Sequence, residues 1–226
     1  MTGGALQRSS GRGPAAVVIM RGCGAERSIA RSEVDIKRWL EGPPSVDAVR
    51  PGRCPECGAA GSPPGEPHGL HGHGLRDRQF RGPCSPGEPP VIVVVRVRRY
   101  RCQRCGAVVT VAPRETAARR LYTLSAVAWA LALFGVARLS EPDARRGTSP
   151  WRIVGAAAAR RWVTLRRWVI AITGRRLFGR LPRPPDRCTT RQAAERIAIA
   201  VSAHAPPTLA SVPLPARAFF GAVHAA

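Results

Sequence analysis

Two matching cysteine pairs constrain what this chain can fold into more than any other feature. Cys54 and Cys57 stand in the segment CPECG, and Cys102 and Cys105 stand in CQRCG. A Cys-x-x-Cys turn places two thiolates on one side of an ion, and the following glycine lets backbone amides point at sulfur. Two such turns supply the four ligands of a zinc site that is closed to substrate. We therefore expect one structural Zn²⁺ ion; a redox-active dithiol or chance spacing are the alternatives.

Other potential metal ligands lie between the two pairs. Four of them fall in a Gly- and Pro-rich stretch: His68, His71, His73 and Cys84. They can replace a zinc ligand or bind a second ion, but His-Gly repeats are also common loop composition, which we favour. Cys23 and Cys188 are isolated, and we interpret them as ordinary thiols. No secretory signal is recognisable, so we expect a reducing cytosol, where paired cysteines indicate metal before disulfide.

The segments around the cysteine pairs predict a small β unit. Residues 91–101 (VIVVVRVRRYR) alternate between apolar and basic side chains, which is typical of a strand. Residues 107–111 (AVVTV) follow a tight turn and predict a second strand, so the two form a hairpin. We expect a zinc ribbon over residues 51–113, in which the Gly-, Pro- and His-rich stretch 58–90 is a long loop insertion.

The charge balance requires an anionic partner. The chain has 36 Lys plus Arg against 14 Asp plus Glu, a net charge of +22, and Lys37 is the only lysine. The excess is +8 over residues 1–113 and +14 over residues 114–226. A GC-rich genome favours arginine over lysine, but it does not remove acids. A polyanion is the usual partner of such a chain, with nucleic acid first and an anionic membrane surface second.

The second half of the chain predicts helices. Residues 149–172 resemble the last two helices of a helix-turn-helix, because Ser149-Pro150 is a good helix start and Gly174 ends the pattern. The residues expected to pack inward are Trp151, Val154, Leu165 and Trp168. The residues expected to face DNA are Arg160, Arg161, Thr164, Arg166 and Arg167. The alternative is a solvated arginine-rich face on a plain helical bundle.

An uncharged stretch precedes these helices. Residues 121–137 carry no charge over 17 residues, which is short of the ~20 that a membrane span needs. Arginines flank both ends, so the charge bias that would orient a span is missing. We interpret the stretch as the buried first helix of the domain.

No catalytic constellation is visible in the sequence. A nuclease needs several carboxylates that converge on metal ions. After Arg114 the acidic residues are Glu115, Glu141, Asp143, Asp186 and Glu195. We therefore do not expect an enzyme.

These motifs together resemble a known arrangement. A CPxCG knuckle, the segment His73-Gly74-Leu75-Arg76, a strand ending in YRCxxCG and a W-R-x-[IV] … T-L-R-R-W helix pair look like the N-terminal half of bacterial insertion-sequence transposases. They are closer still to stand-alone zinc-ribbon/helix-turn-helix proteins that carry a domain of unknown function. The resemblance covers about residues 50–172. In the transposases a ribonuclease-H-like nuclease follows, which we do not expect here; the resemblance implies end binding or regulation of DNA.

The expected fold is α+β. A leader with a short strand and a helix (1–50) precedes the small β zinc ribbon (51–113). An all-α helix-turn-helix domain (114–180) and a linker, C-terminal helix and Pro-rich tail (181–226) follow, with irregular Gly/Pro-rich loops between the elements.

The expected function is DNA binding in the cytoplasm, associated with the nucleoid and linked to a transposable element. Double-stranded DNA is the expected partner, with a transposase or another mobile-element protein beside it, and neither a small-molecule substrate nor a membrane. On the ribbon, the residues expected to contact phosphates are Arg96, Arg98, Arg99 and Arg101. The alternatives are a truncated transposase that cuts DNA through Glu141 or Asp143, an RNA-binding zinc ribbon, and a membrane-surface protein.

Overall fold

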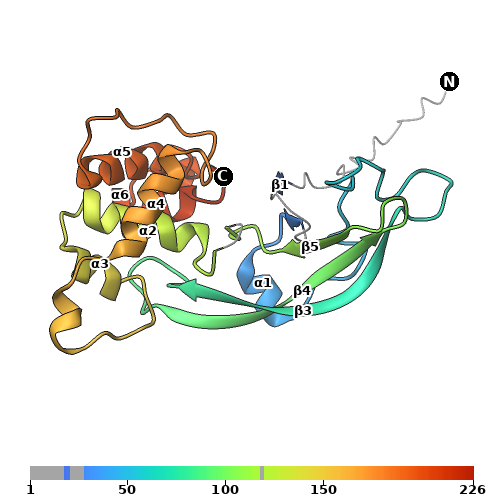
Figure 1. The fold of residues 1–226 in the computed structure, drawn as a ribbon, viewed down its shortest axis with the longest axis horizontal. Helices are drawn as coiled ribbons and strands as arrows, with labels where there is room; N and C mark the ends of the chain where they lie inside the picture. Colours follow the sequence, from blue (N-terminus) through green and yellow to red (C-terminus); the bar gives the residue numbers. More distant parts are fainter. Residues whose placement is uncertain (1–17, 21–27, 118–119) are drawn as a thin grey trace, which may run out of the picture.

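The computed structural model describes residues 18–20, 28–117 and 120–226, which form a mixed β-sheet at one end and a helical bundle at the other (Figure 1). The sheet has five strands in the order β1-β2-β5-β4-β3. Their bounds are β1 Val18–Met20, β2 Ile29–Arg31, β3 Leu70–Gly82, β4 Val91–Cys102 and β5 Val108–Ala112. β2 runs parallel to β5, and the other neighbouring strands are antiparallel.

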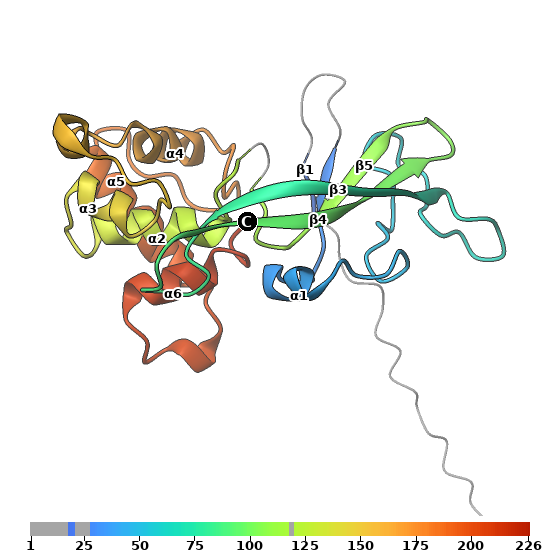
Figure 2. The same cartoon turned by 90° about the horizontal axis from the view of Figure 1, so that it is seen from below.

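The centre of the sheet is the hairpin that the sequence predicts. β4 pairs with β5 in antiparallel register, with Tyr100 opposite Val109. Val95 and Val97 of β4 are buried, as the alternation indicates. A short helix, α1 (Ile36–Glu41), lies beside the sheet (Figure 2) and contacts β4. Trp39 of this helix is buried. Asp35 caps this helix by accepting a hydrogen bond from the Arg38 amide.

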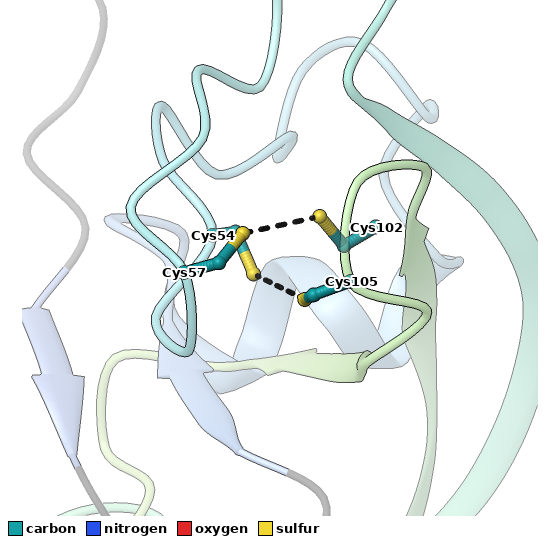
Figure 3. Close-up of side chains that lie close together, drawn as sticks. All are labelled: Cys54, Cys57, Cys102 and Cys105. Atoms are coloured by element: carbon teal, nitrogen blue, oxygen red, sulfur yellow. Dashed lines mark hydrogen bonds between the residues drawn. The ribbon is translucent and has the colours of Figure 1, made fainter.

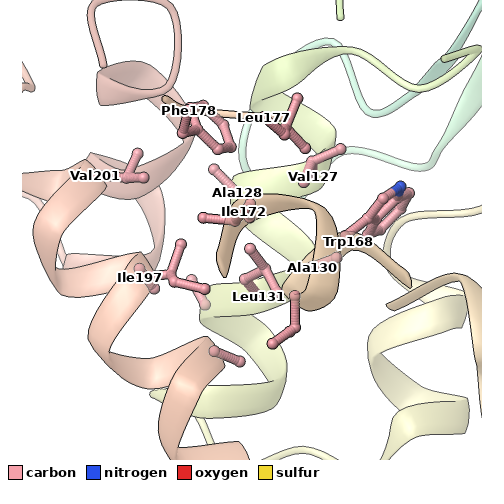
Figure 4. Close-up of a cluster of buried hydrophobic side chains, with 14 of the residues drawn as sticks. Val127, Ala128, Ala130, Leu131, Trp168, Ile172, Leu177, Phe178, Ile197 and Val201 are labelled. Carbon is pink, nitrogen blue, oxygen red and sulfur yellow. The ribbon is translucent and has the colours of Figure 1, made fainter. Parts of the chain in front are cut away.

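The helical half is built around one buried helix. Ten of the twelve residues of α2 (Leu124–Gly135) are buried, so the uncharged stretch is a core helix. Figure 4 shows how the apolar side chains of the surrounding helices converge on it. The other helices are α3 (Glu141–Arg146), α4 (Val163–Thr173), α5 (Thr190–Ser202) and α6 (Leu214–Gly221), with 3-10 turns η1 (Gly155–Ala159) and η2 (Pro207–Leu209). In the described part of the chain, no helix is both long enough and apolar enough to span a membrane.

The sheet corrects the expected fold class. The expectation of a small zinc ribbon is wrong, because the structure has a mixed five-stranded sheet that also includes β1 and β2 from the expected leader. The expected loop insertion contains β3, a strand of 13 residues. β3 is an edge strand whose pattern is mostly exposed, with Leu70 and Phe80 as its buried apolar side chains. Pairing with the valine-rich β4, and not its own alternation, holds it in the sheet.

The helical half corrects the fold class as well. The helix-turn-helix expected over residues 149–172 is not present, because residues 151–154 have no regular secondary structure and η1 follows instead of an α-helix. Gly155 has a φ of +65°, which interrupts any helix that begins at Pro150. α5, at the position of the predicted C-terminal helix, and α6, in the segment predicted as a Pro-rich tail, pack against α2 and fill its faces. The apolar residues of 151–154 therefore have no core position left.

Candidate metal centre and arginine surface

The four predicted cysteines meet at one end of the sheet (Figure 3). The Sγ atoms of Cys54 and Cys105 are 3.8 Å apart, those of Cys57 and Cys102 are 3.6 Å apart, and all four lie within 4.8 Å of one another. Zn–S bonds near 2.3 Å in a tetrahedron place neighbouring sulfurs about 3.8 Å apart. The thiols are free and not disulfide-bonded. The cluster can therefore hold a metal ion.

The two knuckles have the same backbone geometry. In the first, the Gly58 amide donates to the Cys54 carbonyl at 2.9 Å, and in the second the Gly106 amide donates to the Cys102 carbonyl at 2.9 Å. Both glycines have a φ of +72°, a conformation that other residues rarely adopt. This explains why each cysteine pair is followed by glycine. One knuckle belongs to the loop before β3, and the other is the β4–β5 turn, so an ion bound by both would tie the two together.

The electrostatics of the cluster favour a bound cation. Burial raises the pKa of the Cys54 thiol. Burial also acts against ionisation of Cys102, but hydrogen bonds from the amides of Cys105 and Arg104 and from the thiols of Cys57 and Cys105 together outweigh it and lower that pKa to about 7. At Cys105 the Ala107 amide favours the thiolate, while burial and the neighbouring thiols raise the pKa to about 12. Four thiols this close cannot all ionise without a cation between them.

The histidines and the other cysteines lie apart from this cluster. His68, His71 and His73 are exposed, and the His68 ring pairs with the Ser62 hydroxyl at 3.0 Å. Cys84 lies beyond the far end of β3, half-buried. In the described part of the chain they join no cluster that could hold a metal. Cys188 is half-buried in the helical half, and Cys23 lies outside the described residues.

The four arginines of β4 do not form one surface. Arg96 and Arg101 are exposed, but side chains alternate along a strand, so they lie on opposite faces. Arg98 is half-buried, and its Nε donates to the Pro44 carbonyl. Arg99 is half-buried, with its Nε inaccessible to solvent. Their contact with phosphates stays a prediction.

The arginines of the helical half lie together along α4 and the segment before it. Arg160, Arg161, Arg166 and Arg167 are exposed, and Thr164 is half-buried. Leu165 and Trp168 are buried, as predicted, so the helix presents its basic side outward. No ion pair between described residues involves any of these four arginines. Their guanidinium groups are therefore available to an anionic partner.

The segment before α4 differs from the prediction. Trp151 and Val154, predicted to pack inward, are 54% and 80% exposed. Sequence reasoning also missed Arg145, a buried side chain that donates from Nη2 to the Ala158 carbonyl at 2.6 Å. The sequence gives little evidence that Arg145 is buried, because one arginine in an arginine-rich chain looks like any other.

The two acidic residues of the alternative in which the protein cuts DNA, Glu141 and Asp143, form hydrogen bonds and an ion pair within the folded chain. Glu141 Oε2 accepts the Trp162 amide at 2.5 Å, which fixes the start of α4. Asp143 pairs with Arg146 and accepts a hydrogen bond from the Ser140 hydroxyl, and these contacts hold its pKa below the usual value. Both carboxylates therefore already have partners in the folded chain.

A cavity that the sequence did not indicate lies between the sheet and the helices. Its volume is about 260 Å³, and its lining includes Phe80, Cys84, Glu115 and Phe219. Glu115 is buried and accepts the Ile36 amide at 3.0 Å. The cavity marks where the two halves of the molecule meet.

Comparison of this chain with known protein families, with curated proteins and with solved structures found no match. The site residues are therefore interpreted on their geometry and chemistry alone.

Proposed function

We propose that this protein binds DNA through the arginines of α4 and its preceding segment, and that a structural Zn²⁺ ion holds the sheet end together. The observation that carries the DNA proposal is the exposed set of arginines without acidic partners, in a part of the chain that contains few acids. Such a set neutralises phosphates and releases their counterions.

The zinc proposal rests on the donor set. Four thiolates in a tetrahedral arrangement suit Zn²⁺ among the common divalent ions. The residues that would hold it are Cys54, Cys57, Cys102 and Cys105, and the ion would neutralise their charge. With four protein ligands no position remains for a substrate, so the role of the ion is structural.

The DNA proposal is tested by binding to a mixed-sequence duplex across a salt series. For the wild type we expect log K to fall linearly with log salt, with a slope close to −1 for each phosphate contact. The double variant Arg166→Ala/Arg167→Ala should weaken binding by about tenfold or more and reduce the slope by about two. Arg38→Ala is the control, because Arg38 is exposed on α1 and already paired with Glu41.

If the double variant binds duplex DNA as tightly as the wild type does, the proposal is wrong. Preference for structured RNA at matched salt would select the RNA-binding alternative instead. The link to a mobile element rests on the sequence resemblance, and preference for transposon-end duplexes over scrambled ones tests it.

A further inference from the structure

The exposed apolar side chains of this protein concentrate beside its arginines. Twelve large apolar residues are exposed among those described, and five of them fall between residues 151 and 170. They are Trp151, Ile153, Val154, Val163 and Ile170, with exposed fractions between 43% and 80%. Arginines alternate with them along the chain: Arg152, Arg160, Arg161, Arg166 and Arg167. An apolar set flanked by unpaired cations indicates a binding surface.

The segment that carries the most exposed of these residues is anchored on both sides. At its start, the buried Ser149 hydroxyl accepts from Tyr122 Oη at 2.9 Å and from the Trp151 amide at 3.4 Å. At its end, Trp162 is buried, with its ring centroid 5.1 Å from that of Trp168. Between them the buried Arg145 holds the Ala158 carbonyl. The exposed residues therefore lie in a segment whose two ends are held by the bundle.

We infer that residues 151–154 form an apolar wedge that enters between base pairs and bends duplex DNA, while the α4 arginines hold the phosphates on either side. This inference rests on the proposed DNA-binding function. Proteins that bend DNA insert apolar side chains between base steps and neutralise the adjacent backbone with arginine. Ile153 and Val154 are the wedge residues, and Arg152 and Arg160 flank them. Trp151 is braced from behind by Arg81, whose Cζ lies 5.4 Å from the ring centroid.

Charge and shape favour DNA over an anionic membrane as the occupant. An interfacial helix needs a continuous apolar face towards the lipid. The apolar face of α4 is instead buried in the bundle, through Leu165, Trp168 and Ile172. On the exposed side Arg166 lies between Val163 and Ile170 at helical spacing, and Arg167 follows it, so two guanidinium groups interrupt the apolar surface in the middle of the helix. This pattern suits a partner that presents charge beside apolar surface, as the phosphates and stacked bases of a duplex do.

The test measures bending and affinity separately. The probe is a duplex of about 30 base pairs with central TA steps, labelled at its ends for resonance energy transfer, because such steps kink readily. For the wild type we expect a shorter end-to-end distance, equivalent to a bend of about 20–90°. The variant Ile153→Ser/Val154→Ser should abolish this change and lower affinity by less than about tenfold, while Arg166→Ala/Arg167→Ala should weaken binding by about tenfold or more.

The control is Leu40→Ser, since Leu40 is 45% exposed on α1, which packs against β4 in the sheet end. Binding without bending in the wild type overturns the wedge and leaves the DNA proposal standing, whereas no binding at all overturns both. Vesicles of phosphatidylserine and phosphatidylcholine provide the second arm. If the wedge variant loses vesicle binding but bends DNA as the wild type does, the surface belongs to a membrane and the inference is wrong.

Discussion

The sheet end and the helical bundle bury their apolar side chains to different extents. The bundle has one cluster of 26 buried apolar residues, of which 12 are alanines, and the sheet end has a cluster of 14 that includes Cys54 and Cys102. Small side chains let the helices approach closely, and we expect such packing to be the main source of the stability of the bundle. A smaller core needs an additional crosslink, and a metal ion is one. If the cysteines bind a metal ion, we therefore expect the stability of the sheet end to depend on that ion and the stability of the bundle to depend on close packing.

Removal of the metal is the change expected to have the largest effect. Cys102→Ser, or chelation at neutral pH, should abolish stoichiometric metal binding and unfold the loop around Cys54 and the β4–β5 turn. Structural zinc contributes on the order of 10 kcal/mol in small domains, which exceeds the stability of most of them. Hydrogen exchange should show fast amides in β5 and retained protection in α2.

Cys188→Ser is the control for this experiment, because Cys188 lies in the helical half, away from the cluster. Equal loss of protection in both halves would show that they form one cooperative unit, and the contrast between them would be wrong. An unchanged sheet end after complete metal removal would contradict the structural role of the ion.

We expect the addition of a single methyl group between α2 and α5 to lower the stability of the bundle. Gly135 ends α2, and a Cβ there would lie 2.4 Å from the Glu195 amide nitrogen of α5. Gly135→Ala therefore forces the two helices apart, and overpacking of this kind costs about 1–3 kcal/mol. Urea unfolding followed by helical circular dichroism measures it, with metal content expected to stay at the wild-type level.

Gly52→Ala is the matched control, since a Cβ at that position meets nothing within 4 Å. An unchanged unfolding midpoint for Gly135→Ala would mean that α2 and α5 can separate without cost. The alanine-rich packing would then not be what holds the bundle.

The same contrast explains what the sequence could predict. The metal ligands follow from spacing, because a Cys-x-x-Cys-Gly turn brings its own two sulfurs together by local geometry. The hairpin of β4 and β5 follows from alternation. β3 could not be found this way, since an edge strand with few buried residues lacks the pattern, and its partner decides its conformation.

The prediction of a helix that begins at Ser149-Pro150 is wrong for a different reason. Ser149-Pro150 followed by Trp151 is a good local signal for a helix start. The structure overrides it through contacts from distant residues, namely Arg145 and Glu141, which hold the backbone at Ala158 and Trp162. Propensity is a weak predictor where tertiary hydrogen bonds compete with it.

The smallest effect expected concerns Glu115, which lines the cavity where the two halves meet. Burial raises its pKa above the ordinary value of 4.5. The carboxyl group of Glu115 therefore holds its proton more tightly in the folded state than in the unfolded chain. The contribution of the protonated carboxyl to folding stability is full below pH 4.5 and is lost as pH rises through the folded-state pKa. Glu115→Gln stays neutral throughout, so its stability relative to the wild type should increase with pH, by at most about 1.4 kcal/mol per pH unit. Urea unfolding of both proteins from pH 4.5 upward measures the difference in their free energies of unfolding. Both proteins contain the cysteine cluster, so its pH dependence cancels in this difference. A difference that does not vary with pH would mean that water reaches the carboxylate and that the junction is looser than either half.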